Sequence, residues 1–184
     1  MSIPADLKTR QLLAQAAAWR LASLLLERPR PEWKSEIAEL RNEVADRKLA
    51  SCAKRAACGT EEIYHRIFGP AGAVSPREVS YCGFEDPGGL MAELASFYHA
   101  FSFQSRGEEP ADHISVEAGF VAYLFLKEAY ARMTGDAESI EVTKKARQRF
   151  TDEHVGRCAR GMIARLSDGP AYLRKALLWL AEPG

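Results

Sequence analysis

Residues 109–134 read EPADHISVEAGFVAYLFLKEAYARMT and contain the strongest helical signal of the chain. Apolar and aromatic side chains recur through this stretch at helical spacing, and Gly135 follows as a stop. Pro110 cannot continue a preceding helix, and Asp112 is a good N-cap residue. The sequence therefore predicts a helix that begins at Asp112 and ends before Gly135. Asp112 and His113 are expected side by side at its start, where the chain turns toward solvent.

Two interpretations of the Asp112 and His113 pair are open. In the structural one, Asp112 only caps the helix and His113 fills its first turn, and residue chemistry alone favours this interpretation. In the functional one, a carboxylate and an imidazole are presented together to a ligand. The surrounding sequence decides between them.

Helical signals dominate the rest of the chain, and strand signals are almost absent. Leu and Ala recur at three- and four-residue spacing in several segments, which proline, glycine or capping residues separate. Many helices with short connections predict an all-α bundle, with residues 1–184 as a single domain. Further helices are predicted over residues 6–27, 32–57, 61–68, 90–103, 137–150 and 172–180. Another helix is predicted to begin after a cap at Thr151.

The longest irregular stretch is Gly69 to Gly89, which is rich in glycine and proline. A loop of this length in a compact domain is usually functional or flexible. We expect it to be a mobile hinge that divides the helices into two sets, 1–68 and 90–184. Such a hinge permits helix exchange between two copies, so a dimer alongside the monomer is also expected.

Charge is balanced overall, with 25 Lys and Arg against 25 Asp and Glu among 184 residues, so nucleic acid is not an expected partner. The distribution is uneven. Residues 61–129 carry 11 acidic and 4 basic side chains, whereas the segments before and after them are basic. An acidic middle that contains the Asp112 turn favours a basic partner, with a solvated face as the alternative.

Catalytic motifs are absent from the sequence. It has no glycine-rich phosphate loop, no GxSxG and no HExxH. The four cysteines and four histidines show no metal-ligand spacing, and the cysteines are expected to be reduced thiols. We therefore expect no catalytic activity, no metal and no cofactor. No uncharged run approaches the roughly 18 residues of a membrane span, which favours a cytoplasmic, unprocessed protein.

The order of several elements resembles the TorD/DmsD/NarJ-type redox-enzyme maturation chaperones over most of the chain, from Arg10 to Leu180. The densest match is the segment EPADHISVE at 109–117, followed by Phe120, Tyr123 and Leu124. The Asp-His pair resembles the TorD and DmsD branches more than the nitrate-reductase-type relatives. The other matching elements are IFGP at 67–70, Ser75-Pro76 with Tyr81, LASFY at 94–98, FTDEHV at 150–155 and Pro170-Ala171-Tyr172.

The resemblance implies an all-helical cytoplasmic chaperone. Such a protein binds the N-terminal twin-arginine signal of a molybdenum-cofactor oxidoreductase, holds the apo-form of its catalytic subunit, and assists cofactor insertion and assembly before export. Asp112 and His113 match the pair implicated in signal-peptide binding. Two departures stand out. Cys158 replaces a frequent tryptophan four residues after His154, and the usual acidic residue before the central tyrosine is missing at Val79-Ser80-Tyr81.

A twin-arginine signal presents two guanidinium groups and an apolar stretch, so its receptor needs carboxylates beside an apolar groove. Spacing suggests that Phe97, Phe101, Phe120 and Tyr123 line this groove, although residue type favours core packing for Phe97 and Phe120. His113 is expected to adjust affinity with pH. A helical assembly subunit of a redox complex and a nucleotide-dependent switch are the alternatives, the latter without a phosphate loop. The expected signal-peptide site comprises Asp112, His113, Glu109, Pro110, Glu117, Tyr81 and Tyr123, with Glu108 as a further carboxylate.

Overall fold

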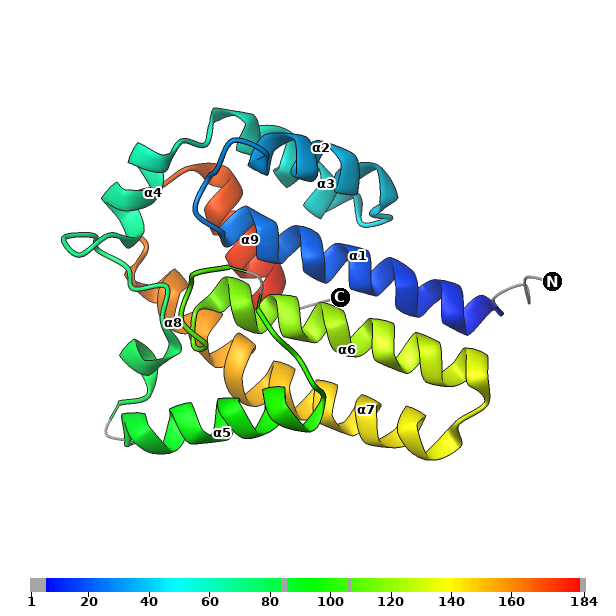
Figure 1. Ribbon diagram of the computed structural model, residues 1–184. Helices are drawn as coiled ribbons and strands as arrows, with labels where there is room; N and C mark the ends of the chain where they lie inside the picture. Colours follow the sequence, from blue (N-terminus) through cyan, green and yellow to red (C-terminus); the bar gives the residue numbers. More distant parts are fainter. Residues whose placement is uncertain (1–5, 84–85, 106, 183–184) are drawn as a thin grey trace.

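The computed structural model describes residues 6–83, 86–105 and 107–182, and within these it is all-α, as the sequence predicts (Figure 1). No helix in the described part is both long and apolar enough to cross a membrane. Short 3₁₀ turns lie at Ala56–Cys58 (η1) and Glu78–Tyr81 (η2), and a π-turn lies at Thr151–Val155 (η3). The α-helices are α1 Leu7–Leu26, α2 Trp33–Glu43, α3 Arg47–Arg55, α4 Glu61–Phe68, α5 Pro87–Ala100, α6 Ile114–Thr134, α7 Ala137–Phe150, α8 Gly156–Arg165 and α9 Ala171–Ala181.

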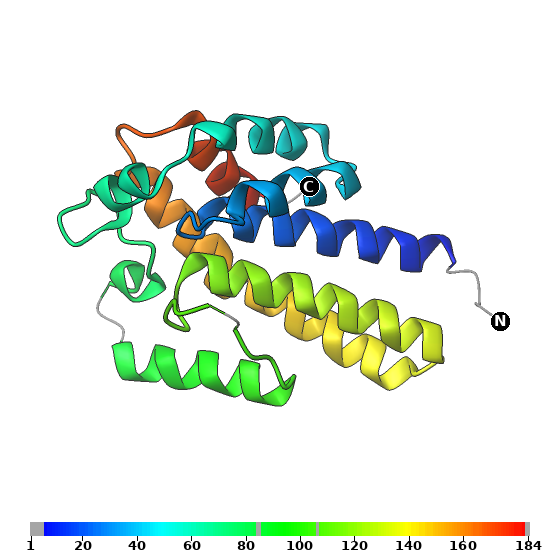
Figure 2. The same cartoon turned by 45° about the horizontal axis from the view of Figure 1, so that its top comes forward.

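The centre of the molecule is the antiparallel pair of α1 and α6, which lie side by side in both ribbon views (Figures 1 and 2). Small residues allow the two helices to approach closely. A Cβ on Gly119 would stand 3.4 Å from the Ser23 hydroxyl. That hydroxyl donates to the Ser115 carbonyl oxygen across 2.8 Å. At the other end, Arg132 pairs with Asp6 at 3.0 Å.

The remaining helices pack around this pair. Helices α2 and α3 lie against α1, α7 lies along α6, and α8 and α9 pack on each other behind them (Figure 1). Helix α5 lies at the lower edge of both views (Figure 2). The site described below joins η2 and the residue before it to the start of α6 and to α4.

Predicted boundaries differ from the structure at the junctions of α2 with α3 and of α7 with α8. The helix predicted over 32–57 is divided into α2 and α3, because Asp46 accepts hydrogen bonds from the Lys48 and Leu49 amides and so caps a new helix. Thr151 does not cap a helix. It lies in the π-turn, where the Gly156 amide donates to its carbonyl oxygen five residues back, so α7 runs on into α8.

Residues 69–83 are irregular apart from η2, as predicted, and residues 84 and 85 lie outside the described residues. Residues 87–89 were predicted to be irregular as well, but they form the first turn of α5, because Asp86 caps it by accepting from the Gly88 and Gly89 amides. The first part of the stretch 69–89 is held by backbone hydrogen bonds. The Glu78 amide donates to the Asp112 carbonyl, and the Ile114 amide donates to the Pro76 carbonyl. The division into two sets of helices, the hinge and the helix-exchanged dimer stay predictions.

Aromatic rings join α5, α6 and α7. Phe150 is fully buried. Its ring centroid lies 4.7 Å from that of Phe120 and 5.1 Å from that of Phe97, and both pairs have edge-to-face geometry. The rings of Tyr98 and Phe103 pack on Phe120 as well. This cluster attaches α5 to the rest of the bundle.

Replacing Phe150 with alanine is expected to lower the free energy of unfolding by about 3–5 kcal/mol, because it removes the ring that three helices share. Urea denaturation of the full chain measures the change. Tyr130→Ala on α6, where the side chain is 67% exposed, is the matched control and should change stability by no more than about 0.5 kcal/mol. Equal losses in the two variants would contradict the role of the cluster.

Candidate functional site

The turn before α6 is closed by His113, not by Asp112. The His113 amide donates to the Pro110 carbonyl at 2.9 Å, and the His113 carbonyl accepts from the Val116 and Glu117 amides. His113 is the N-cap, and its Nδ1 accepts from the Ser115 amide at 3.2 Å. The prediction that Asp112 caps this helix is wrong. The Asp112 side chain is thereby free for another partner.

That partner is Arg77 in the stretch 69–89. Asp112 Oδ1 accepts from Arg77 Nε at 2.9 Å and lies 2.8 Å from Arg77 Nη2, so the two side chains form a charged pair. The second carboxylate oxygen of Asp112 accepts from the Val79 amide at 3.3 Å. Asp112 is 0% exposed, whereas the Arg77 side chain is 44% exposed. The expectation that Asp112 faces solvent is therefore wrong, because the guanidinium covers it.

His113 is buried as well, at 1% exposure. Its Nδ1 accepts from the Ser115 amide, so the ring proton is on Nε2, which lies 3.0 Å from the Tyr64 hydroxyl. Burial, and then the charge of Arg77, lower the pKa of His113 to about 3. The imidazole is neutral near pH 7. The expectation that it adjusts affinity in the physiological pH range is therefore wrong.

Glu117 is fully buried, and its carboxyl group lies beside the Glu78 carboxylate. Burial raises its pKa well above the ordinary value. The charge of Glu78, a hydrogen bond with Glu78 and then the charge of Asp112 raise it further. Glu117 is therefore a neutral acid inside the bundle. It does not supply the surface carboxylate that the sequence suggested.

Glu78 on η2 is the next acidic residue in this network, and sequence reasoning missed it. It is 0% exposed, accepts from Arg157 at 2.7 Å and lies 3.1 Å from His154 Nδ1. Burial alone would raise the pKa of Glu78, but the hydrogen bonds with His154 and Arg157 hold it below the ordinary value. The only sequence signal was the Ser75-Pro76-Arg77-Glu78 pattern, which looks like a helix cap.

The remaining predicted site residues are only partly brought together. Glu109 is 27% exposed, and its carboxylate lies 3.8 Å from His113 Nε2, with Pro110 beside it at the rim of the turn. Tyr81 packs on Gly161 of α8, where a Cβ would stand 2.4 Å from its ring. Tyr123 lies farther along α6, where its hydroxyl donates to the Phe101 carbonyl at 2.9 Å.

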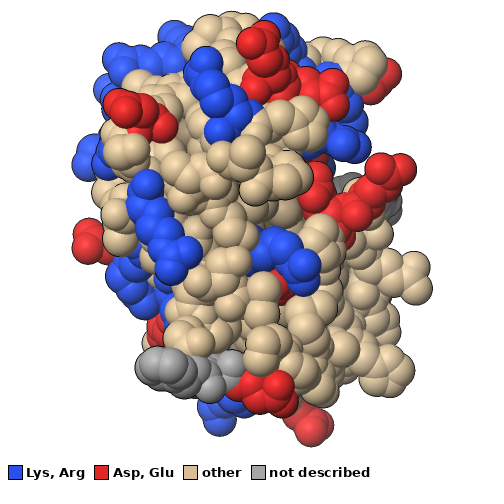
Figure 3. Space-filling model, turned by 90° about the vertical axis from the view of Figure 1, so that its left-hand side faces the viewer, with Lys and Arg blue, Asp and Glu red and all other residues tan. Residues whose placement is uncertain are grey.

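The predicted apolar groove is mostly core. Phe120 is 0% exposed and forms the centre of the aromatic cluster, and Phe97 and Phe101 pack against it. The predicted acidic surface is reduced too, since Glu78, Asp112, Glu117 and Glu128 are all buried. Figure 3 shows the molecule from the left-hand side of Figure 1, and basic and acidic side chains are intermixed on this face.

The described residues form an all-α bundle with a buried charged network at the start of α6. The comparison with family models matches residues 28–160 to the nitrate reductase delta subunit family. The chain belongs to this family of redox-enzyme maturation chaperones, which is related to the TorD and DmsD proteins. A comparison with curated proteins finds no match.

The family match supports a general role in molybdoenzyme maturation, with a molybdoenzyme subunit as the partner. It describes a maturation factor rather than a catalyst. The match does not distinguish the TorD and DmsD branches from the nitrate-reductase type, so the predicted branch stays a prediction.

The free energy of unfolding of Glu117→Gln, relative to that of wild type at the same pH, is expected to increase as pH rises from about 5 to about 8. Above the ordinary glutamate pKa, the unfolded chain releases the Glu117 proton while the folded chain keeps it, so wild-type stability falls with pH. Glutamine has no such proton. Urea denaturation across this pH range measures the difference between the two proteins.

Glu128→Gln is the control, because it removes a buried pair with Arg147 at 2.8 Å and should be destabilising. A Glu117→Gln variant that is less stable than wild type by a constant amount at every pH would contradict a neutral Glu117.

Proposed function

We propose that this protein is a cytoplasmic chaperone that binds the twin-arginine signal of a molybdenum-cofactor oxidoreductase. It holds the apo-form of the catalytic subunit while the cofactor is inserted, before export. The observation that supports this most is the Arg77 and Asp112 pair. A guanidinium already lies on a buried carboxylate at the turn that resembles the family's signal-binding element.

In this proposal an arginine of the signal peptide replaces Arg77 at Asp112. The exchange substitutes one guanidinium for another, so the buried carboxylate is never left without a partner. Arg77, rather than the buried Asp112, is the residue of the pair that moves away, because the Arg77 side chain is 44% exposed and can turn to solvent. Glu109 stands at the rim of the same turn and pairs with the second arginine.

His113 and Glu117 then act by position rather than by direct contact. His113 connects the turn to Tyr64 of α4 and to Ser115, which fixes the carbonyl and amide groups around Asp112. Pro110 shapes the turn, and neutral Glu117 lies beneath it. Tyr81 ends η2, and its hydroxyl donates to the Ser75 carbonyl at 2.6 Å.

The apolar part of the signal is proposed to lie along an exposed face of α6. Tyr123, Leu126, Tyr130 and Met133 are three, four and three residues apart, which places them on one side of the helix. Leu126 and Met133 are each 49% exposed, and Tyr130 is 67% exposed. From His113 to Tyr123 the helix rises about 15 Å, a distance that about five extended peptide residues span.

The test is equilibrium binding of a labelled twin-arginine peptide to the full chain. Asp112→Asn should weaken binding by about tenfold or more, because a charged hydrogen bond contributes roughly 1.5 to 3 kcal/mol. Arg77→Lys should strengthen binding severalfold, because lysine pairs through a single point charge and competes less well for the carboxylate. The thermal midpoint of each variant, measured alongside, separates unfolding from loss of the site.

A peptide with two lysines in place of the arginines is the ligand control, and Arg160→Lys, an exposed residue of α8, is the protein control. If Asp112 serves only to hold the stretch 69–89, Arg77→Lys will weaken binding as Asp112→Asn does. Binding that ignores both variants and both arginines would favour a structural subunit, and binding of a guanine nucleotide in place of the peptide would favour a switch.

A further inference from the structure

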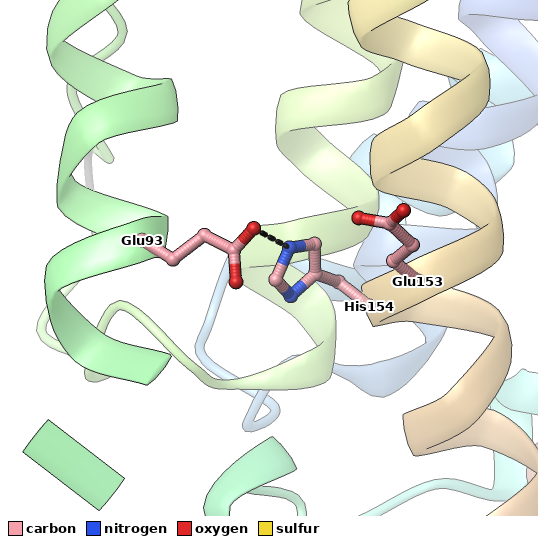
Figure 4. A group of neighbouring side chains, drawn as sticks. All are labelled: Glu93, Glu153 and His154. Carbon is pink, nitrogen blue, oxygen red and sulfur yellow. Dashed lines mark ion pairs between the residues drawn. The ribbon is translucent and has the colours of Figure 1, made fainter. Parts of the chain in front are cut away.

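Glu93 on α5 and the neighbours Glu153 and His154 on the π-turn η3 form a second cluster. Each residue offers one potential ligand atom, and these three atoms all lie within 4.8 Å of one another. Figure 4 shows Glu93 reaching from its own helix toward the imidazole of His154. The Glu93 and Glu153 side chains are 39% and 52% exposed, whereas the histidine is buried.

His154 supplies the observation that points to a ligand. Its Nδ1 lies 3.1 Å from the Glu78 carboxylate, and since a carboxylate only accepts, Nδ1 carries the proton. In the neutral imidazole the lone pair is therefore on Nε2. This atom has no hydrogen-bond partner although the side chain is 1% exposed, and it lies 4.0 Å from Glu93 Oε1, too far for a hydrogen bond.

A histidine whose other nitrogen donates to a buried carboxylate has the usual arrangement of a metal ligand, because that contact fixes the ring orientation and makes the free nitrogen more basic. Glu78 provides this contact, and Arg157 holds Glu78 in place at 2.7 Å. π-turns inside helices also recur at functional sites. The free Nε2 is thus held in one direction by the fold itself.

We propose that Glu93, Glu153 and His154 bind a divalent transition-metal ion of the zinc type. One imidazole nitrogen and two carboxylate oxygens are three protein ligands, which leaves a further position for water. Metal–ligand distances of about 2.0–2.2 Å require the carboxylates to move closer to Nε2 than they are now. The side chains of both glutamates are about half-exposed, so their carboxylates can make this movement.

Arg149 occupies the place of the cation at present. Its guanidinium lies 2.7 Å from Glu93 and 2.7 Å from Glu153, so one positive charge already gathers the two carboxylates. The Arg149 side chain is 56% exposed, and its guanidinium turns to solvent when the ion enters. A bound ion would connect α5 to the continuous helix formed by α7, η3 and α8.

Calorimetric titration of the chelator-treated full chain with Zn²⁺ near pH 7.5 tests the site. One ion per chain is expected, with affinity falling at least about tenfold in Glu93→Gln and in Glu153→Gln. Arg149→Gln should bind Zn²⁺ more tightly than wild type, because it removes the competing cation. These three side chains lie at the surface, so the variants are expected to fold.

The controls use a similar surface carboxylate and a crystallographic readout. Glu141→Gln, on the exposed side of α7, should leave Zn²⁺ affinity unchanged. Crystals grown with Zn²⁺ should show an anomalous peak at His154 Nε2. No binding, a peak at the exposed Cys58 or at His65 instead, or an affinity indifferent to the Glu93, Glu153 and Arg149 variants would overturn the proposal.

Discussion

The buried charge of Asp112 constrains the rest of the site. An ionised carboxylate without exposure is tolerated only with a charged partner and further hydrogen bonds, and Arg77 and the Val79 amide provide them. This pair ties the stretch 69–89 to the first turn of α6. Glu78, the residue next to Arg77, is thereby placed inside the bundle, where it orients His154. One ion pair thus links two clusters that are far apart in the sequence.

Much of the fold could be predicted because its signals are local. The Leu and Ala periodicity of α1, and the start and stop signals of α6 at Pro110 and Gly135, all act within a few residues of the element they define. The break between α2 and α3 depends on a single cap at Asp46, which a longer apolar pattern concealed. The π-turn had no local signal in the sequence. Thr151 is a residue type that is typical of a helix N-cap, so a cap was predicted there instead.

The site was less predictable, because burial of a charged residue depends on partners that only the fold brings together. Counting carboxylates suggested an acidic surface, yet Asp112 is paired with a residue 35 positions earlier and Glu117 is neutral. The cluster around His154 was invisible to spacing rules, because one of its carboxylates comes from α5, about sixty residues before the histidine. The family resemblance drew attention to the turn at Asp112, whereas the contacts of its residues could be described only from the three-dimensional structure.

The π-turn η3 also sets the angular register between α7 and α8. A π-turn holds one residue more than an α-turn, and each residue of an α-helix rotates the next by about 100°. The extra residue therefore turns every later side chain of α8 about its axis relative to α7. In the present register Cys158 and Met162 point into the core at 0% exposure while Arg160 points to solvent. The length of this segment, more than its composition, determines which side of α8 the protein keeps inside.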